Sequence, residues 1–164
     1  MIDDYFLNLN YSPVHLLSTM YQEAAVAENY YLSPVNVLRC DVSPFLRTEL
    51  SKLINAPFAD CGFLKTPPLK TYPMHIDAFR IAAINMPMFE GTLGVKSFMF
   101  TGKRLEAIEY QTDSFTILNV MKPHGVKNEN TEKERIILSI GFKNNTYSTL
   151  KEMYYNGELI NVAV

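Results

Sequence analysis

From Asp60 onward the sequence is a series of short β-rich segments separated by turn-forming residues, and this pattern constrains the fold most. The segments are, in order, CGFLKT, RIAAINMPMF, VKSFMF, RLEAIEY, FTILNVM and RIILSIGF. The turn signals that follow them are PP, EGTLG, TGK, QTDS, KPHG and KNN. Strands at this spacing are typical of an antiparallel sandwich or barrel. Neither a βαβ alternation nor a Gly-rich phosphate loop occurs, which disfavours a nucleotide-binding α/β fold.

The first third of the chain instead favours helices. Ser12-Pro13 and Ser43-Pro44 each resemble a helix start, because serine can cap free N–H groups and proline suits the first helical position. The predicted helices cover residues 13–29, 44–54 and 148–156, with a short strand at 35–40. We therefore predict one mostly β domain, 1–164, with a helical flank 1–58, a β core 59–143, and a helix and tail 144–164.

Composition narrows the class of protein. With 48% hydrophobic and 20% charged residues over 164 positions, the chain can form its own core. A net charge of −2 argues against a protein whose main function is to bind nucleic acid. No apolar stretch is long enough to predict a membrane span. The start, MIDDYFLNLN, is unlike a signal peptide, so we expect a cytoplasmic protein with reduced Cys40 and Cys61.

The segment TYPMHIDAFR places His75 two residues before Asp77. In a strand or at a strand end, residues i and i+2 project to the same side, so an imidazole and a carboxylate can converge on one metal ion. Taken alone, the spacing also fits an ordinary His–Asp hydrogen bond or an exposed strand end.

His124 follows the strand FTILNVM, and Arg135 opens the strand RIILSIGF eleven residues later. The short polar loop between them predicts a hairpin that lays the two strands side by side. Along the second strand, Arg135, Ile137 and Ser139 share one face, which we expect to line a cavity. A guanidinium beside a hydroxyl suits a carboxylate ligand. The alternative for Arg135 is a solvated strand start paired with a nearby glutamate.

Two imidazoles and one carboxylate on facing strands form the facial triad of non-haem Fe(II) oxygenases, which leaves three coordination positions open. The order His75-x-Asp77, His124, Arg135 resembles that of Fe(II)/2-oxoglutarate-dependent oxygenases. The phrases HIDAFRIAAINMP and PHGVKNENTEKERIILSIGF resemble small proteins of the aspartyl/asparaginyl β-hydroxylase-like group, over residues 60–143. Members of that group are known for two metal histidines without the carboxylate, whereas this chain has Asp77.

The resemblance implies a double-stranded β-helix, the cupin-like jelly roll, behind a helical N-terminal third. It implies that His75, Asp77 and His124 bind Fe(II), and that Arg135 pairs with the C5 carboxylate of 2-oxoglutarate. The implied reaction uses O₂ to hydroxylate a C–H bond and converts 2-oxoglutarate to succinate. We expect a peptide or protein side chain as substrate, then a small amino acid, then a modified nucleobase.

Other polar residues interrupt apolar strands near these positions. Ser139 and Asn119 are predicted to bind the co-substrate, and Arg80, Asn85 and Tyr72 to be catalytic or substrate-binding. Arg80 has an alternative role in a structural ion pair, and either asparagine could instead satisfy a backbone group at a bulge.

Two other classes of function remain open. One is a cupin-like metalloenzyme that binds metal without using 2-oxoglutarate. The other is a non-catalytic jelly-roll interaction module, in which loss of His75 would leave any biological activity unchanged.

Overall fold

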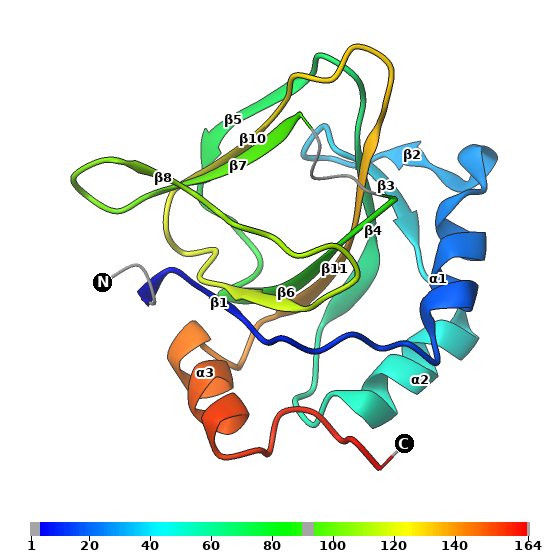
Figure 1. Ribbon diagram of the computed structural model, residues 1–164, viewed down its shortest axis with the longest axis vertical. Helices are drawn as coiled ribbons and strands as arrows, with labels where there is room; N and C mark the ends of the chain where they lie inside the picture. Colours follow the sequence, from blue (N-terminus) through cyan, green and yellow to red (C-terminus); the bar gives the residue numbers. More distant parts are fainter. Residues whose placement is uncertain (1–3, 90–93, 164) are drawn as a thin grey trace.

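The computed structural model describes residues 4–89 and 94–163, which form two facing antiparallel sheets (Figure 1). The larger sheet has the strand order β1-β9-β6-β11-β4-β3-β2, and the smaller has the order β5-β10-β7-β8. The large-sheet strands are β1 Phe6–Asn8, β2 Tyr31–Leu32, β3 Leu38–Asp41, β4 Asp60–Thr66, β6 Ala82–Met88, β9 Thr116–Leu118 and β11 Arg135–Phe142. The small-sheet strands are β5 Thr71–His75, β7 Val95–Phe100, β8 Leu105–Ala107 and β10 His124–Asn128.

Strand β11 lies at the centre of the large sheet and is buried along its whole length. Ile136, Leu138 and Ile140 join the main hydrophobic core on the side of the helices. Arg135 and Ser139 line the cavity between the sheets. The predicted division of this strand into an apolar and a cavity face is confirmed.

Helices α1 Leu17–Ala24 and α2 Pro44–Leu53 cover the outer face of the large sheet (Figure 1). The predicted start of α2 is confirmed, because Ser43 Oγ accepts a hydrogen bond of 3.1 Å from Leu46 N–H. The predicted start of α1 at Pro13 is wrong. The segment after Ser12 closes as a turn, with Leu16 N–H donating to Pro13 O at 2.8 Å, and α1 begins without a side-chain cap.

A helical N-terminal third is not what the structure shows. β1, β2 and β3 belong to this region, and they place strands at both ends of the large sheet. These strands are two to four residues long and have mixed exposure, so they lack the alternation by which strands are recognised in a sequence. After β11 the predicted C-terminal helix is confirmed as α3 Tyr147–Tyr155.

The predicted hairpin between His124 and Arg135 is also wrong. β10 pairs with β5 and β7 in the small sheet, whereas β11 pairs with β4 and β6 in the large sheet. Asn128, at the end of β10, donates through Nδ2 to backbone carbonyls of Thr66, Pro67 and Lys133. These hydrogen bonds hold the segment 129–134 as a crossover from the small sheet to the large sheet. His124 and Arg135 therefore lie on opposite walls of one cavity.

Across the described residues, the structure contains no helix with the length and apolar character needed to cross a membrane.

Candidate metal centre

Three potential metal ligands meet where β5 ends and β10 begins. His75 and His124 stand opposite each other in the pairing of these strands. Asp77 follows β5, and its N–H donates to Val120 O at 3.1 Å. Their ligand atoms all lie within 4.8 Å of one another. Each imidazole Nε2 is 3.5 Å from Asp77 Oδ1, so the three groups converge on one point.

Backbone carbonyls orient both imidazole rings. Nδ1 of His75 is 2.9 Å from Pro73 O, and Nδ1 of His124 is 2.9 Å from Lys122 O. A carbonyl can only accept, so each Nδ1 carries the proton and donates it. Nε2 of each ring faces the convergence point, where it donates to Asp77 when it is protonated and offers its lone pair to a metal when it is not, as in histidines that bind metals.

The surroundings keep Asp77 ionised. Its side chain is 11% exposed, and burial by itself would raise its pKa. Hydrogen bonding to His124 and His75, together with the charge of Arg80, overcomes burial and holds the pKa well below its ordinary value. The hydrogen bond with Asp77 raises the pKa of His75. Two imidazoles and one carboxylate make a donor set that fits Fe(II), because imidazole nitrogen and carboxylate oxygen are ligands that Fe(II) accepts and both are available unprotonated near neutral pH.

The triad opens into a cavity of about 650 Å³ between the two sheets. Apolar side chains of Leu64, Ile137 and Val120 form part of its wall. At its mouth lie exposed apolar side chains, namely Tyr31, Val35, Ile76 and Phe79.

Arg135 enters the same cavity from β11. The residue is 4% exposed, and its Nη2 donates to Ser97 Oγ at 3.0 Å. Its guanidinium also lies 5.7 Å from the ring centroid of Tyr110. Burial lowers the pKa of Arg135, yet no carboxylate among the described residues pairs with it. Burying a guanidinium without an acidic partner costs free energy, and a bound anion would offset that cost.

The alternative partners for Arg135 are engaged elsewhere or exposed. Glu134 pairs with Lys65 at 3.0 Å, and Glu132 is exposed.

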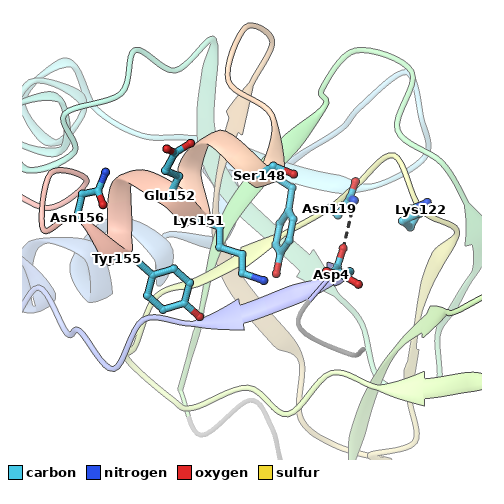
Figure 2. Close-up of a pocket in the computed structure, with 9 residues that line it drawn as sticks. Asp4, Asn119, Lys122, Ser148, Lys151, Glu152, Tyr155 and Asn156 are labelled. Atoms are coloured by element: carbon cyan, nitrogen blue, oxygen red, sulfur yellow. Dashed lines mark hydrogen bonds between the residues drawn. The ribbon is translucent and has the colours of Figure 1, made fainter.

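The remaining predicted residues divide between two places. Ser139, Arg80, Asn85 and Tyr72 line the cavity of the triad. Asn119 does not: its Nδ2 donates to Asp4 O at 3.4 Å in a separate pocket beside α3 (Figure 2). The position predicted for Asn119 beside the co-substrate is therefore corrected, since the side chain satisfies a backbone carbonyl instead.

Of the two roles left open for Arg80, the structure shows the ion pair. Its Nε donates to Asp77 Oδ2 at 2.8 Å, and its Nη1 donates to Ser139 Oγ at 2.8 Å. Asn85 Nδ2 donates to Tyr110 at 3.3 Å, while Asn85 Oδ1 is buried without a partner. Tyr72 donates to Lys65 O at 3.5 Å.

Ser97 and Tyr110 are site residues that the sequence did not indicate. Ser97 lies inside the predicted strand VKSFMF, and its position there could have marked it as facing inward. Tyr110 lies beyond the end of β8, and no sequence signal places it near Arg135.

No protein-family model matches the sequence, and a search of curated proteins finds no relative. Solved structures do match. A Pseudomonas putida prolyl-4-hydroxylase aligns with a TM-score of 0.60 and 16% identity, over 87% of this chain and 94% of that one. HygX from Streptomyces hygroscopicus, solved with nickel and 2-oxoglutarate bound, aligns with a TM-score of 0.54 and 10% identity, over 89% of this chain and 86% of that one.

A Trichoplax adhaerens prolyl hydroxylase was solved with a fragment of the hypoxia inducible factor oxygen degradation domain. It aligns with a TM-score of 0.56 and 12% identity, over 84% of this chain and 82% of that one. These similarities define the fold: the chain has the jelly-roll architecture of solved 2-oxoglutarate–Fe(II) oxygenases.

Proposed function

We propose that this protein is an Fe(II)- and 2-oxoglutarate-dependent dioxygenase that hydroxylates a C–H bond. One observation carries the proposal: a His-Asp-His cluster and a buried guanidinium, which has no acidic partner among residues 4–89 and 94–163, line the same cavity. A metal site alone would fit many enzymes. A metal site facing an isolated buried cation fits a co-substrate that chelates the metal at one end and carries a carboxylate at the other.

His75, Asp77 and His124 would hold Fe(II) through two Nε2 atoms and one carboxylate oxygen. When bound, Fe(II) with 2-oxoglutarate and O₂ supplies the oxidising chemistry, in which the C–H bond becomes C–OH and 2-oxoglutarate becomes succinate and CO₂. The carbonyls of Pro73 and Lys122 keep the rings oriented, so no proton needs to move within the imidazoles when a ligand arrives.

Arg135 would bind the far carboxylate of 2-oxoglutarate. Ser97 fixes one end of the guanidinium, and Tyr110 lies over it, so its remaining N–H donors are held in place for a bidentate partner. Because the site is buried, a carboxylate here would be bound more strongly than one at the surface. Ser139 is a further hydroxyl on this wall.

The substrate is proposed to be a peptide or protein side chain, with a small amino acid as the alternative. Apolar Val35, Ile76 and Phe79 at the mouth favour a substrate that brings apolar surface to the metal. Asn85 Oδ1 and the hydroxyl of Tyr72 are the proposed polar contacts. The Trichoplax neighbour, solved with a peptide fragment, supports this order.

We assign the chain to the aspartyl/asparaginyl β-hydroxylase-like group as part of the same proposal. Its support is the likeness of HIDAFRIAAINMP and PHGVKNENTEKERIILSIGF, and Asp77 is the departure.

Succinate formation tests the proposal. The protein is supplied with Fe(II), 2-oxoglutarate, ascorbate and O₂, and succinate is measured with and without pooled peptides. We expect 2-oxoglutarate turnover that His124→Ala abolishes and that His15→Ala, at an exposed turn before α1, leaves unchanged. Metal binding without succinate would favour a cupin-like metalloenzyme, and failure to bind metal would favour a non-catalytic module.

A further inference from the structure

Arg80 contacts one oxygen of the Asp77 carboxylate and leaves the other oxygen facing the two imidazoles. Its Nε lies 2.8 Å and its Nη2 lies 2.5 Å from Oδ2, so two charged donors hold this one oxygen. The other oxygen, Oδ1, lies 3.5 Å from both imidazole Nε2 atoms. The carboxylate therefore presents Oδ1 alone to the point where the three ligands converge.

Arg80 is itself anchored on the opposite sheet. Its Nη1 donates to Ser139 Oγ at 2.8 Å, and Ser139 is 1% exposed in the middle of β11. The guanidinium thus connects the loop after β5 to the floor of the cavity. Its donors contact Asp77 and Ser139, so the side chain is placed to orient a ligand rather than to receive a substrate.

A glycine in β11 makes room for this arginine. A Cβ atom built on Gly141 would lie 2.3 Å from Arg80 Cδ and 2.5 Å from Asp60 Oδ1. Both separations are shorter than real Cβ contacts, so any side chain at 141 would displace the arginine stem. The sheet therefore provides a passage along which Arg80 reaches Asp77.

We propose that Arg80 is a positioning residue that restricts Asp77 to binding the metal through one oxygen, keeping three coordination positions open. The inference rests on the proposed function. A six-coordinate ion with two imidazoles and one carboxylate oxygen has three free positions. If Asp77 bound through both oxygens, two positions would remain, enough for a chelating 2-oxo acid and too few for a further ligand. Arg80 prevents this by occupying Oδ2.

The test asks how many ligands the metal accepts beside 2-oxoglutarate. Under anaerobic conditions, protein loaded with Fe(II) and saturated with 2-oxoglutarate is exposed to nitric oxide, and the high-spin Fe–NO signal is measured by electron paramagnetic resonance. Bound Fe(II) is quantified in each sample. The variants are Arg80→Ala, Arg80→Lys and Gly141→Ala. Arg104→Ala is the matched control, because Arg104 also pairs with a nearby carboxylate, Glu106, but lies on the hairpin before β8, outside the cavity.

We expect Arg80→Ala to retain Fe(II) and lose about tenfold or more of the Fe–NO signal per bound iron, the range over which outer-shell partners of metal ligands act. Gly141→Ala should show the same loss with the arginine still present. Arg80→Lys should recover part of the signal, since an ammonium can still hold Oδ2. The control should match the unaltered protein.

Two results would overturn the positioning role: an undiminished Fe–NO signal in Arg80→Ala, or a folded Arg80→Ala that no longer retains Fe(II). In both cases the proposed function stands if the unaltered protein still forms its 2-oxoglutarate complex. If the unaltered protein does not bind Fe(II), the proposed metal site is refuted, and the proposed role of Arg80 is refuted with it.

Discussion

Replacing Arg135 by methionine should weaken 2-oxoglutarate binding and at the same time stabilise the empty protein. Arg135 is 4% exposed and has Ser97 Oγ as a hydrogen-bond partner at 3.0 Å, with no acidic partner among the described residues. Burial of the Arg135 charge therefore lowers the free energy of unfolding of the empty protein, and a bound anion would offset this loss. Methionine has a similar length and no charge.

The two effects have different magnitudes. Truncating one partner of a buried, hydrogen-bonded charge pair costs roughly 2–5 kcal/mol. A loss of about 3 kcal/mol corresponds to roughly a 150-fold rise in the Kd for 2-oxoglutarate. Replacing buried charge by apolar volume is neutral or stabilising, so the free energy of unfolding should rise by about 1 kcal/mol. For a chain of this size that raises the Tm by roughly 2–4 °C.

Calorimetric titration with 2-oxoglutarate, with Ni(II) in place of Fe(II) to prevent turnover, measures the first effect. Thermal unfolding without ligand measures the second. Arg104→Met controls for loss of an arginine outside the cavity and should change neither quantity appreciably. The proposed role of Arg135 is refuted if Arg135→Met binds 2-oxoglutarate as tightly as the unaltered protein, or if it unfolds at a clearly lower temperature.

Three further predictions concern the scaffold. Glu23→Ala should lower the free energy of unfolding by about 1–2 kcal/mol, because Glu23 accepts from Ser43 N–H at 2.8 Å and from its hydroxyl at 2.5 Å, at the start of α2. Asn128→Ala should cost about 2 kcal/mol in denaturant unfolding, because three backbone carbonyls lose their shared donor. Two lysines lower the pKa of Glu129 from 4.5 to about 2, so the stability difference between the protein and Glu129→Gln should be present above pH 4.5 and disappear toward pH 2.

Each of these has its own control. Ser51→Ala, on the exposed face of α2, should leave stability nearly unchanged, as should Asn145→Ala at an exposed loop. Because Glu129 is exposed, its effect should be small and should shrink in high salt. A stability difference at Glu129 that grows as the pH falls would contradict the assigned direction of its pKa shift.

The parts of the fold that follow from local sequence were predictable. Alternation along RIILSIGF separated Arg135 and Ser139 from the core side chains, since residues two apart in a strand share a face. Ser43-Pro44 marked a helix start because both residues act within one turn. The spacing of two residues between His75, which ends β5, and Asp77, which follows it, brought their ligand atoms together locally.

The parts that depend on distant partners were not predictable. β10 faces β11 across a cavity instead of pairing with it, and the crossover after β10 is held by hydrogen bonds of Asn128 to residues more than sixty positions away. Ser12-Pro13 has the residues of a helix start, yet the chain turns there before reaching α1. Asn119 interrupts an apolar strand in the same manner as Asn85, and only the tertiary arrangement turns one to Asp4 and the other into the cavity.

The most direct test of the proposed Fe(II) and 2-oxoglutarate site is an anaerobic titration of metal-free protein with Fe(II) and 2-oxoglutarate, followed by visible absorption. We predict a metal-to-ligand charge-transfer band that is absent in His124→Ala and that needs far more 2-oxoglutarate in Arg135→Met. Bound Fe(II) without this band at saturating 2-oxoglutarate would contradict the assignment of the cavity to an oxygenase.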